Sequence, residues 1–238
     1  MNDKIRIIAR LDVKGENVVK GVHLEGLRIM GKPEILAKKY NDEGIDELIY
    51  IDSVASLYGR NSLNEIVEKA ANEIRIPITV GGGIRTIDDI NTLLRNGADK
   101  IAINTQAIKQ PEFITQAAHK FGSQCIILSV AAKKIGQDKW EAYTDNGRQP
   151  TGCDVVEWVQ RGELLGAGEI LLTSIDREGT KKGFEIELYE KVYEKTTVPV
   201  IASGGAGNID DIIYCANSNA VNAIAIASIL HYNENSIL

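Results

Sequence analysis

The chain has 238 residues, of which 44% are hydrophobic and 25% charged, and its formal net charge is −6. This length suits one large α/β domain or two small ones, and the acidic balance gives no sign of a nucleic-acid surface. No segment approaches the roughly 18 apolar residues of a membrane helix, and the first residues lack the features of a signal peptide. The cysteines, Cys125, Cys153 and Cys215, have no metal-ligand spacing and fit a reducing compartment. We therefore predict a cytoplasmic α/β protein without membrane or nucleic-acid partners.

Short β-branched runs alternate with longer segments of helical period. We expect strands at 5–12, 47–52, 77–81, 99–104, 124–131, 169–174, 198–203 and 222–227. Most are continuously apolar, as is typical of parallel strands buried on both faces. Amphipathic helices are expected between them, at 33–43, 61–74, 86–96, 110–121, 153–165, 184–195 and 208–217. Eight strands with seven intervening helices predict a (β/α)₈ barrel, with an open doubly wound sheet as the structural alternative.

An internal repeat favours the barrel. PITVGGGIRTIDDI at 77–90 matches PVIASGGAGNIDDI at 199–212, and GIDELIYID at 44–52 matches GAGEILLTS at 166–174, both at an offset of 122 residues. Two half-barrels, neither able to bury its own sheet, would close into a single domain covering 1–238. An insert at 133–152 carries Asn146-Gly147 after WEAYT, which predicts a β-hairpin after the fifth strand. Only about ten residues follow the eighth strand, which is short for a closing helix.

Two glycine clusters follow the third and seventh strands, Gly81-Gly82-Gly83 and Gly204-Gly205, and each precedes a helix. Glycine lets the backbone approach a phosphate, and the helix N-terminus supplies N–H donors. Tight turns alone would also explain such glycines. Their duplication at equivalent positions favours two phosphate sites on opposite sides of the barrel mouth, suited to a ligand with a phosphate at each end.

Asp12 closes a largely apolar strand and is a candidate general acid or base at the barrel mouth. A capping or loop-bonding role is the alternative. The equivalent position at the end of the fifth strand is Ala131, so a symmetric acid–base pair is incomplete.

Four charged residues begin strands at the other end of the barrel: Arg6, Glu47, Lys100 and Glu169. Two cations and two anions at similar depth could close a ring across the bottom. Such a ring could be a salt-bridged plug or a gate for a small neutral molecule, and the residues alone favour neither. His23, His119 and His231 are not spaced as metal ligands, and we expect neither a metal nor a cofactor.

These segments resemble a known family. RIIARLDVKG, VGGGIRT, ADKIAINT, GAGEILLTSIDREGTKKG and VIASGGAG together look like the cyclase subunit of imidazole glycerol phosphate synthase, a (β/α)₈ barrel of histidine biosynthesis, over nearly the whole chain. The resemblance implies a glutaminase partner at the N-terminal face, whose ammonia crosses the barrel to a bis-phosphorylated ligand. No cofactor is implied.

The resemblance also implies residue roles. Asp12 would be the catalytic acid or base, Lys20 a mobile first-loop lysine unless it is an ordinary solvated one, and Ala131 the position of a missing second catalytic aspartate. The ring of Arg6, Glu47, Lys100 and Glu169 would be the ammonia gate. The implied phosphate-binding residues are Gly82, Gly83, Asn104 and Thr105 at one end and Asp176, Gly179, Ser203, Gly204, Gly205, Ala227 and Ser228 at the other.

Departures from the family pattern point to a specialised branch. Arg10 precedes LDV where the family has cysteine, Glu178 stands where aspartate is usual, and Ala131 lacks the carboxylate. We expect Arg10 to have an acidic neighbour, Asp12 or Asp52, because an unpaired buried charge is costly. RLDVKG, VASLYGRNSL at 54–63 and TDNGRQPTG resemble a branch linked to acetamidino modification of bacterial surface sugars, in which ammonia is passed to a separate sugar amidotransferase.

Three hypotheses follow. The leading one is an ammonia-channelling synthase subunit of the acetamidino branch. The second is the histidine-pathway cyclase subunit, with Ala131 a natural or engineered loss of a catalytic carboxylate. The third is a non-catalytic scaffold that activates the glutaminase.

Overall fold

The computed structural model describes residues 4–55 and 63–232. Eight parallel strands close into a barrel, since β10 pairs with β7 as well as with β11. In barrel order these strands are β1 (Arg6–Lys14), β4 (Glu47–Asp52), β5 (Ile78–Gly81), β6 (Lys100–Ile103), β7 (Ile126–Gly136), β10 (Glu169–Ser174), β11 (Val200–Ser203) and β12 (Ala223–Ile226). The predicted (β/α)₈ barrel is confirmed, and the open doubly wound sheet is excluded because such a sheet does not close.

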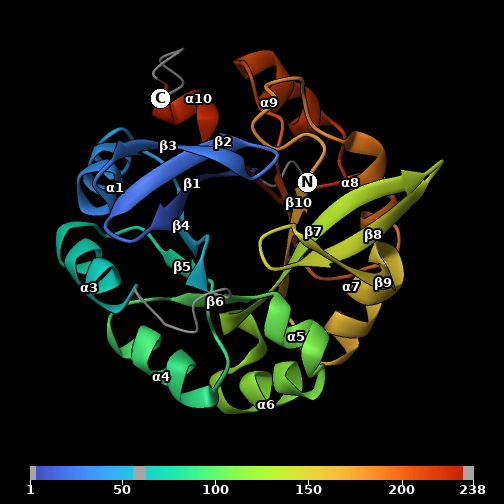
Figure 1. Cartoon of the computed structure of the whole chain (residues 1–238), viewed down its shortest axis with the longest axis horizontal. Coiled ribbons are helices and arrows are strands. Elements are labelled where there is room, and N and C mark those ends of the chain that lie inside the picture. Colours follow the sequence, from blue (N-terminus) through green and yellow to red (C-terminus); the bar gives the residue numbers. More distant parts are fainter. Residues whose placement is uncertain (1–3, 56–62, 233–238) are drawn as a thin grey trace.

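Helices surround the strands, as Figure 1 shows in a view along the barrel. They are α1 (Pro33–Asp42), α3 (Asn64–Glu73), α4 (Ile87–Arg95), α5 (Thr105–Lys109), α6 (Glu112–Phe121), α7 (Val155–Leu164), α8 (Ile186–Tyr193), α9 (Ile209–Asn217) and α10 (Ser228–His231), with a 3₁₀ turn at Ser123–Cys125. Each predicted helix is present within a few residues of its expected ends. Among the residues described, no helix is long and apolar enough to cross a membrane.

The half-length repeat is visible in the helix caps. The Thr86 hydroxyl oxygen accepts from the Asp89 backbone N–H at the start of α4, and the Asp89 carboxylate accepts from the Thr86 backbone N–H. Asn208 and Asp211 make the same reciprocal pair at the start of α9. Both pairs are equivalent under the 122-residue offset, and such capping boxes satisfy N–H groups that the first helical turn leaves unpaired. The repeated IDDI segments therefore place two helix N-termini at equivalent points around the barrel mouth.

Strand alternation sorts the side chains of β1 between two environments. Ala9, Leu11 and Val13 pack in the large apolar cluster between strands and helices, whereas Ile8 belongs to a second cluster inside the barrel. Because successive side chains point to opposite faces, Arg6, Arg10 and Asp12 share the inner face with Ile8. The inner cluster consists of Ile8, Ile49, Ala102, Ile127, Leu171, Ile201, Ala223 and Ala225. The barrel axis thus has charged residues at both ends and an apolar layer between them.

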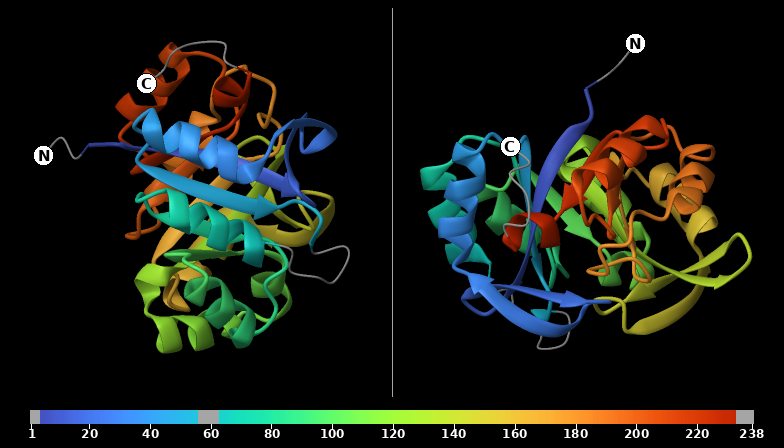
Figure 2. Two further views of the ribbon diagram at one scale, coloured as in Figure 1. Left: turned by 90° about the vertical axis from the view of Figure 1, so that its left-hand side faces the viewer. Right: turned by 90° about the horizontal axis from the view of Figure 1, so that it is seen from above.

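Two antiparallel hairpins extend the barrel at the end opposite the N-terminus (Figure 2, right). The predicted insert after the fifth strand is confirmed: β7 continues to Gly136 and pairs with β8 (Lys139–Thr144), which pairs with β9 (Gln149–Asp154). The other hairpin, β2 (Asn17–Val22) with β3 (Glu25–Gly31), is not expected from the sequence. Both lie over the carboxyl ends of the barrel strands, where the site residues are expected.

Candidate active site

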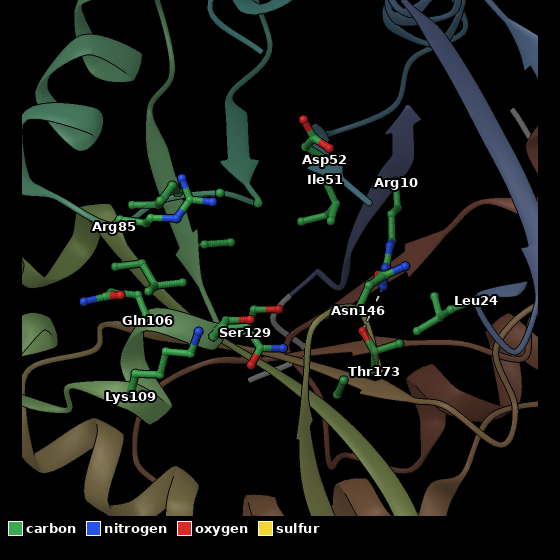
Figure 3. A pocket seen from close by; sticks show the side chains of 18 residues that line it. Arg10, Leu24, Ile51, Asp52, Arg85, Gln106, Lys109, Ser129, Asn146 and Thr173 are labelled. Carbon is green, nitrogen blue, oxygen red and sulfur yellow. Dashed lines mark hydrogen bonds between the residues drawn. The ribbon is translucent and has the colours of Figure 1, made fainter. Parts of the chain in front are cut away.

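A pocket lies at the carboxyl ends of the strands and contains the first predicted phosphate loop (Figure 3). Gly82, Gly83, Asn104 and Thr105 all line it. Gly82 cannot carry a side chain, because its φ is +97° and a Cβ would lie 2.5 Å from the carbonyl oxygen of Asp52. The side chains of Asn104 and Thr105 contact the insert hairpin, with Asn104 Nδ2 donating to the Tyr143 carbonyl at 3.2 Å. The structure therefore brings this group together beneath the insert.

Further polar residues line the same pocket and were not predicted. Arg85 follows the glycine cluster, and Gln106 and Lys109 lie on α5, in the part of the pocket that Figure 3 shows at left. Lys109 follows Thr105 by one helical turn, so the two share a face of α5. The sequence holds two signals for these residues: the i,i+4 spacing of Thr105 and Lys109, and an arginine two residues after the glycine cluster. Two cations beside a glycine loop suit an anionic group.

The residues predicted to bind the second phosphate also lie close together, with one exception. Gly179, Ser203, Gly204, Gly205, Ala227 and Ser228 line a small cavity with Glu178. Asp176 lines neither this cavity nor the larger pocket. Its carboxylate accepts a hydrogen bond from the backbone N–H of Lys134 at 2.8 Å, which holds it against the extension of β7.

Asp12 and Lys20 belong to a buried network of four charges. Asp12 Oδ1 accepts from Arg10 Nε at 2.9 Å, and Asp12 Oδ2 lies 3.5 Å from the Lys20 ammonium. Lys20 also pairs with Glu178. The expectation that Arg10 has an acidic neighbour is thus confirmed, with Asp12 as that neighbour.

Lys20 lies in strand β2 with 2% exposure, so it is not an ordinary solvated loop lysine, whereas the mobile first-loop role that the resemblance implies stays a prediction. Burial lowers the pKa of Lys20 to about 8, despite the opposing attraction of Asp12. Burial alone would raise the pKa of Asp12, but the positive charges of Arg10 and Lys20 outweigh it, so the pKa of Asp12 is lowered. Asp12 is therefore held as a carboxylate that can accept a proton.

Ala131 occupies an apolar part of the mouth. It packs with Leu24 of the β2–β3 turn, with Ile175 and with the ring of Tyr143. The same turn is fixed to the loop after β10, because His23 donates its backbone N–H to the Glu178 carbonyl at 2.8 Å. Ala131 nevertheless lines the larger pocket, so a longer side chain placed there would project towards it.

His231 gives this region a pH-dependent stability. Burial, and then the charge of Lys20, lowers the pKa of His231 to about 4, and its Nδ1 lies 2.7 Å from the Tyr40 hydroxyl. In the unfolded chain, His231 has a pKa near 6.5 and is protonated below that pH, whereas in the folded protein it stays neutral down to about pH 4. The free energy of unfolding therefore falls as the pH drops from 6.5 to 4. We expect urea unfolding to show a loss of at most about 3 kcal/mol between these values, because each pKa unit corresponds to about 1.4 kcal/mol. In His231→Asn this loss should be absent, and parallel profiles for the two proteins would contradict the assignment.

The four charged residues at the opposite end form a closed ring. Arg6 contacts Glu47 at 2.6 Å and Glu169 at 2.5 Å, and Lys100 contacts the same two carboxylates at 3.3 and 2.9 Å. Each cation touches both anions. The carboxylates are almost fully buried, whereas Arg6 and Lys100 retain 29% and 21% side-chain exposure. A closed arrangement whose cations face solvent fits either of the two roles considered above. Within the part of the chain that the structure describes, no cluster of three metal-ligating side chains is present.

Comparison with known proteins identifies the family. A family model described as histidine biosynthesis protein matches residues 6–236. The chain is 59% identical to imidazole glycerol phosphate synthase subunit HisF of Legionella pneumophila, over 87% of this chain and 98% of that protein. It is 47% identical to the same-named subunit of Bacillus cereus strain ATCC 10987, over 98% of this chain and 92% of that protein. The chain belongs to the HisF family.

Membership of the HisF family confirms the resemblance at that level and corrects its finer part. The prediction of a subunit for acetamidino modification of surface sugars is wrong, because relatives matched over nearly their whole lengths are HisF subunits. The sugar amidotransferase partner expected for that branch is likewise not supported. That prediction depended on three short segments, and residues 56–62 of one of them, at 54–63, lie outside the described residues. Short loop segments carry much less information than identities spread over a whole barrel.

Proposed function

We propose that this chain is the cyclase subunit of an imidazole glycerol phosphate synthase and receives ammonia from a glutaminase subunit. The arrangement of the barrel axis carries the proposal: a charged ring at one end, an apolar layer, and at the other end a pocket and a smaller cavity, each lined by one of the two glycine loops. An apolar interior favours passage of neutral ammonia over ammonium, because burying an unpaired charge is costly. The relatives' shared name supplies the reaction.

Each part of the site has a role in this proposal. The first loop, with Gly83, Asn104 and Thr105, holds one phosphate of a bis-phosphorylated ligand, and the second, with Gly179, Gly205 and Ser228, holds the other. Asp12 accepts a proton during ring closure, and the positive charges of Arg10 and Lys20 keep it ionised beforehand. The ring of Arg6, Glu47, Lys100 and Glu169 admits ammonia at the face where the glutaminase docks.

The absence of a carboxylate at position 131 predicts slow chemistry. General acid–base help from one residue is worth about 10²–10⁴-fold in rate. We therefore expect the wild-type chain to form imidazole glycerol phosphate from the bis-phosphorylated family substrate and ammonium at a low but measurable rate, with the Bacillus cereus subunit as positive control. No product from the wild type or from the Ala131→Asp variant described below would overturn the proposal and favour a scaffold that only activates the glutaminase.

The gate can be tested separately from the chemistry. Replacing Lys100 with Glu leaves Arg6 facing three carboxylates, and disrupting partly buried ion pairs costs several kcal/mol. We expect glutamine-dependent product formation with the glutaminase to fall at least about tenfold, as about 1.4 kcal/mol of added barrier would produce. Ammonium-driven formation should remain near the wild-type rate, because ammonium in bulk solution reaches the pocket from its open end.

Lys69→Glu on the outer helix α3 is the matched control, since Lys69 is exposed and outside the ring. Equal losses with glutamine and with ammonium in Lys100→Glu would show that the ring supports the fold rather than the passage of ammonia.

A further inference from the structure

Arg10 is the buried charge whose role the proposed function leaves open. Its side chain is 5% exposed and crosses from β1 towards β10 and β11. Nε donates to Asp12 at 2.9 Å, and Nη1 donates to Thr173 Oγ1 at 2.8 Å and to Ser203 Oγ at 3.0 Å. Three of the five N–H donors of the guanidinium are thereby used, and both hydrogens of Nη1 are among them.

The remaining two donors are on Nη2. This atom has no hydrogen-bond partner among residues 4–55 and 63–232, although the side chain is almost fully buried. Arg10 lines the larger pocket, and Figure 3 shows its guanidinium beside Thr173 at the pocket wall. Nη2 is not one of the fully buried side-chain atoms that lack a partner, so it is open to the pocket, and its two N–H groups are available to an acceptor that a ligand brings.

The position of Arg10 also connects the two phosphate loops. It shares the larger pocket with Gly83 and Asn104, and its partner Ser203 lines the smaller cavity with Gly205. A ligand held by both loops must pass the guanidinium with the part of its chain that lies between the phosphates.

Neutralising Asp12 does not account for all the contacts of the Arg10 side chain. Asp12 already has the Lys20 ammonium within 3.5 Å, and the four charges of Arg10, Asp12, Lys20 and Glu178 sum to zero. A residue that served only Asp12 would use Nε alone. The fork towards Thr173 and Ser203 instead fixes the guanidinium plane and leaves one edge for the pocket.

We propose that Arg10 positions the ligand by donating from Nη2 to an oxygen acceptor, a hydroxyl or a carbonyl, in the organic part between the two phosphate loops. The proposal rests on the proposed function for the identity of that ligand, but not for the chemistry of the contact.

Calorimetric titration of the wild type, Arg10→Lys and the control Arg161→Lys tests it, with imidazole glycerol phosphate, ribulose 1,5-bisphosphate and inorganic phosphate as probes. Lysine keeps the positive charge but cannot reproduce the fork. We expect Arg10→Lys to lose at least about tenfold in affinity for an organic phosphate that the wild type binds, as for a charged hydrogen bond, and little for inorganic phosphate. Arg161 lies on the outer helix α7, so Arg161→Lys should match the wild type.

The outcomes separate the two proposals. Equal affinity changes for organic and inorganic phosphate, or no change for either, would overturn the role of Arg10. Binding of the bisphosphate but not of imidazole glycerol phosphate, with the loss in Arg10→Lys, would overturn the proposed function and support the role of Arg10. Preference of the wild type for neither organic probe over inorganic phosphate would overturn both.

If Arg10→Lys does not fold, the wild type provides the test by NMR of the arginine side chains. The Arg10 Nη2 protons should shift when an organic phosphate is added and not when inorganic phosphate is added. Unchanged Arg10 resonances at saturation would overturn the proposal.

Discussion

Ala131→Asp is expected to increase ammonium-driven turnover by about 10²–10⁴-fold, the range that a positioned general acid or base contributes. The new carboxylate would line the pocket across the barrel from Asp12, and it would lie beside Leu24, Ile175 and Tyr143. That apolar contact favours the protonated acid, because burial raises the pKa of a carboxyl group. The variant would then pair a proton donor at position 131 with the ionised Asp12. Steady-state assays of imidazole glycerol phosphate formation measure this gain.

Ala131→Asn is the matched control, since asparagine has nearly the same shape as aspartate but does not titrate. It should remain at the wild-type rate. Recovery in both variants would show that the gain comes from displacing Leu24 rather than from proton transfer. No gain in Ala131→Asp, with the fold intact by circular dichroism, would contradict the interpretation of Ala131 as a missing catalytic group.

The barrel could be predicted because its signals are local. A parallel strand buried on both faces is apolar through its middle, and the runs at 47–52 and 169–174 are, between polar residues at their ends. The repeat added long-range information, because equivalent segments such as those containing Glu47 and Glu169 occupy equivalent places in the two halves. Thr86 and Asn208, which cap α4 and α9, are likewise local signals, because a cap bonds only to the first turn of its own helix.

The hairpin of β2 and β3 could not be predicted, because its stability comes from tertiary contacts. The segment 17–31 has no continuous apolar run, and β3 is largely exposed. Its position depends on Gly179, where a Cβ would lie 2.2 Å from the Gly21 carbonyl oxygen, and on the pairing of Lys20 with Glu178. The burial of Lys20 follows from that packing, which the residues of 17–31 alone do not indicate. The resemblance implies that Asp176 belongs to the second phosphate loop, but its position is set by a tertiary contact, the hydrogen bond from the Lys134 backbone N–H.

The side chains on the inner face of the barrel change in type along its axis. Alternation along β1 brings Arg6, Ile8, Arg10 and Asp12 to successive heights, from the charged ring through the apolar cluster to the buried charge network beside the pocket. Because each inner position is two residues from the next, a single strand contributes to every layer. A one-residue slip of β1 would turn all four side chains towards the helices, so the register of this strand against β4 and β12 maintains both the charged ring and the position of Asp12.

Asp12→Asn is the other substitution with a large expected effect, on both turnover and stability. It leaves the cations Arg10 and Lys20 buried against Glu178 alone, and removing one partner of a buried ion pair costs about 3–5 kcal/mol. Loss of the proton acceptor should also reduce ammonium-driven turnover of the Ala131→Asp background by about 10²–10⁴-fold. Urea unfolding and steady-state rates measure the two effects independently.

Asp138→Asn is the matched control, since Asp138 lies in the exposed hairpin turn at φ +51°, which asparagine tolerates. Adding Arg10→Met to Asp12→Asn should restore part of the lost stability, because it removes the unpaired cation, but none of the turnover. An Asp12→Asn protein with full turnover would exclude Asp12 as the proton acceptor, whatever its stability.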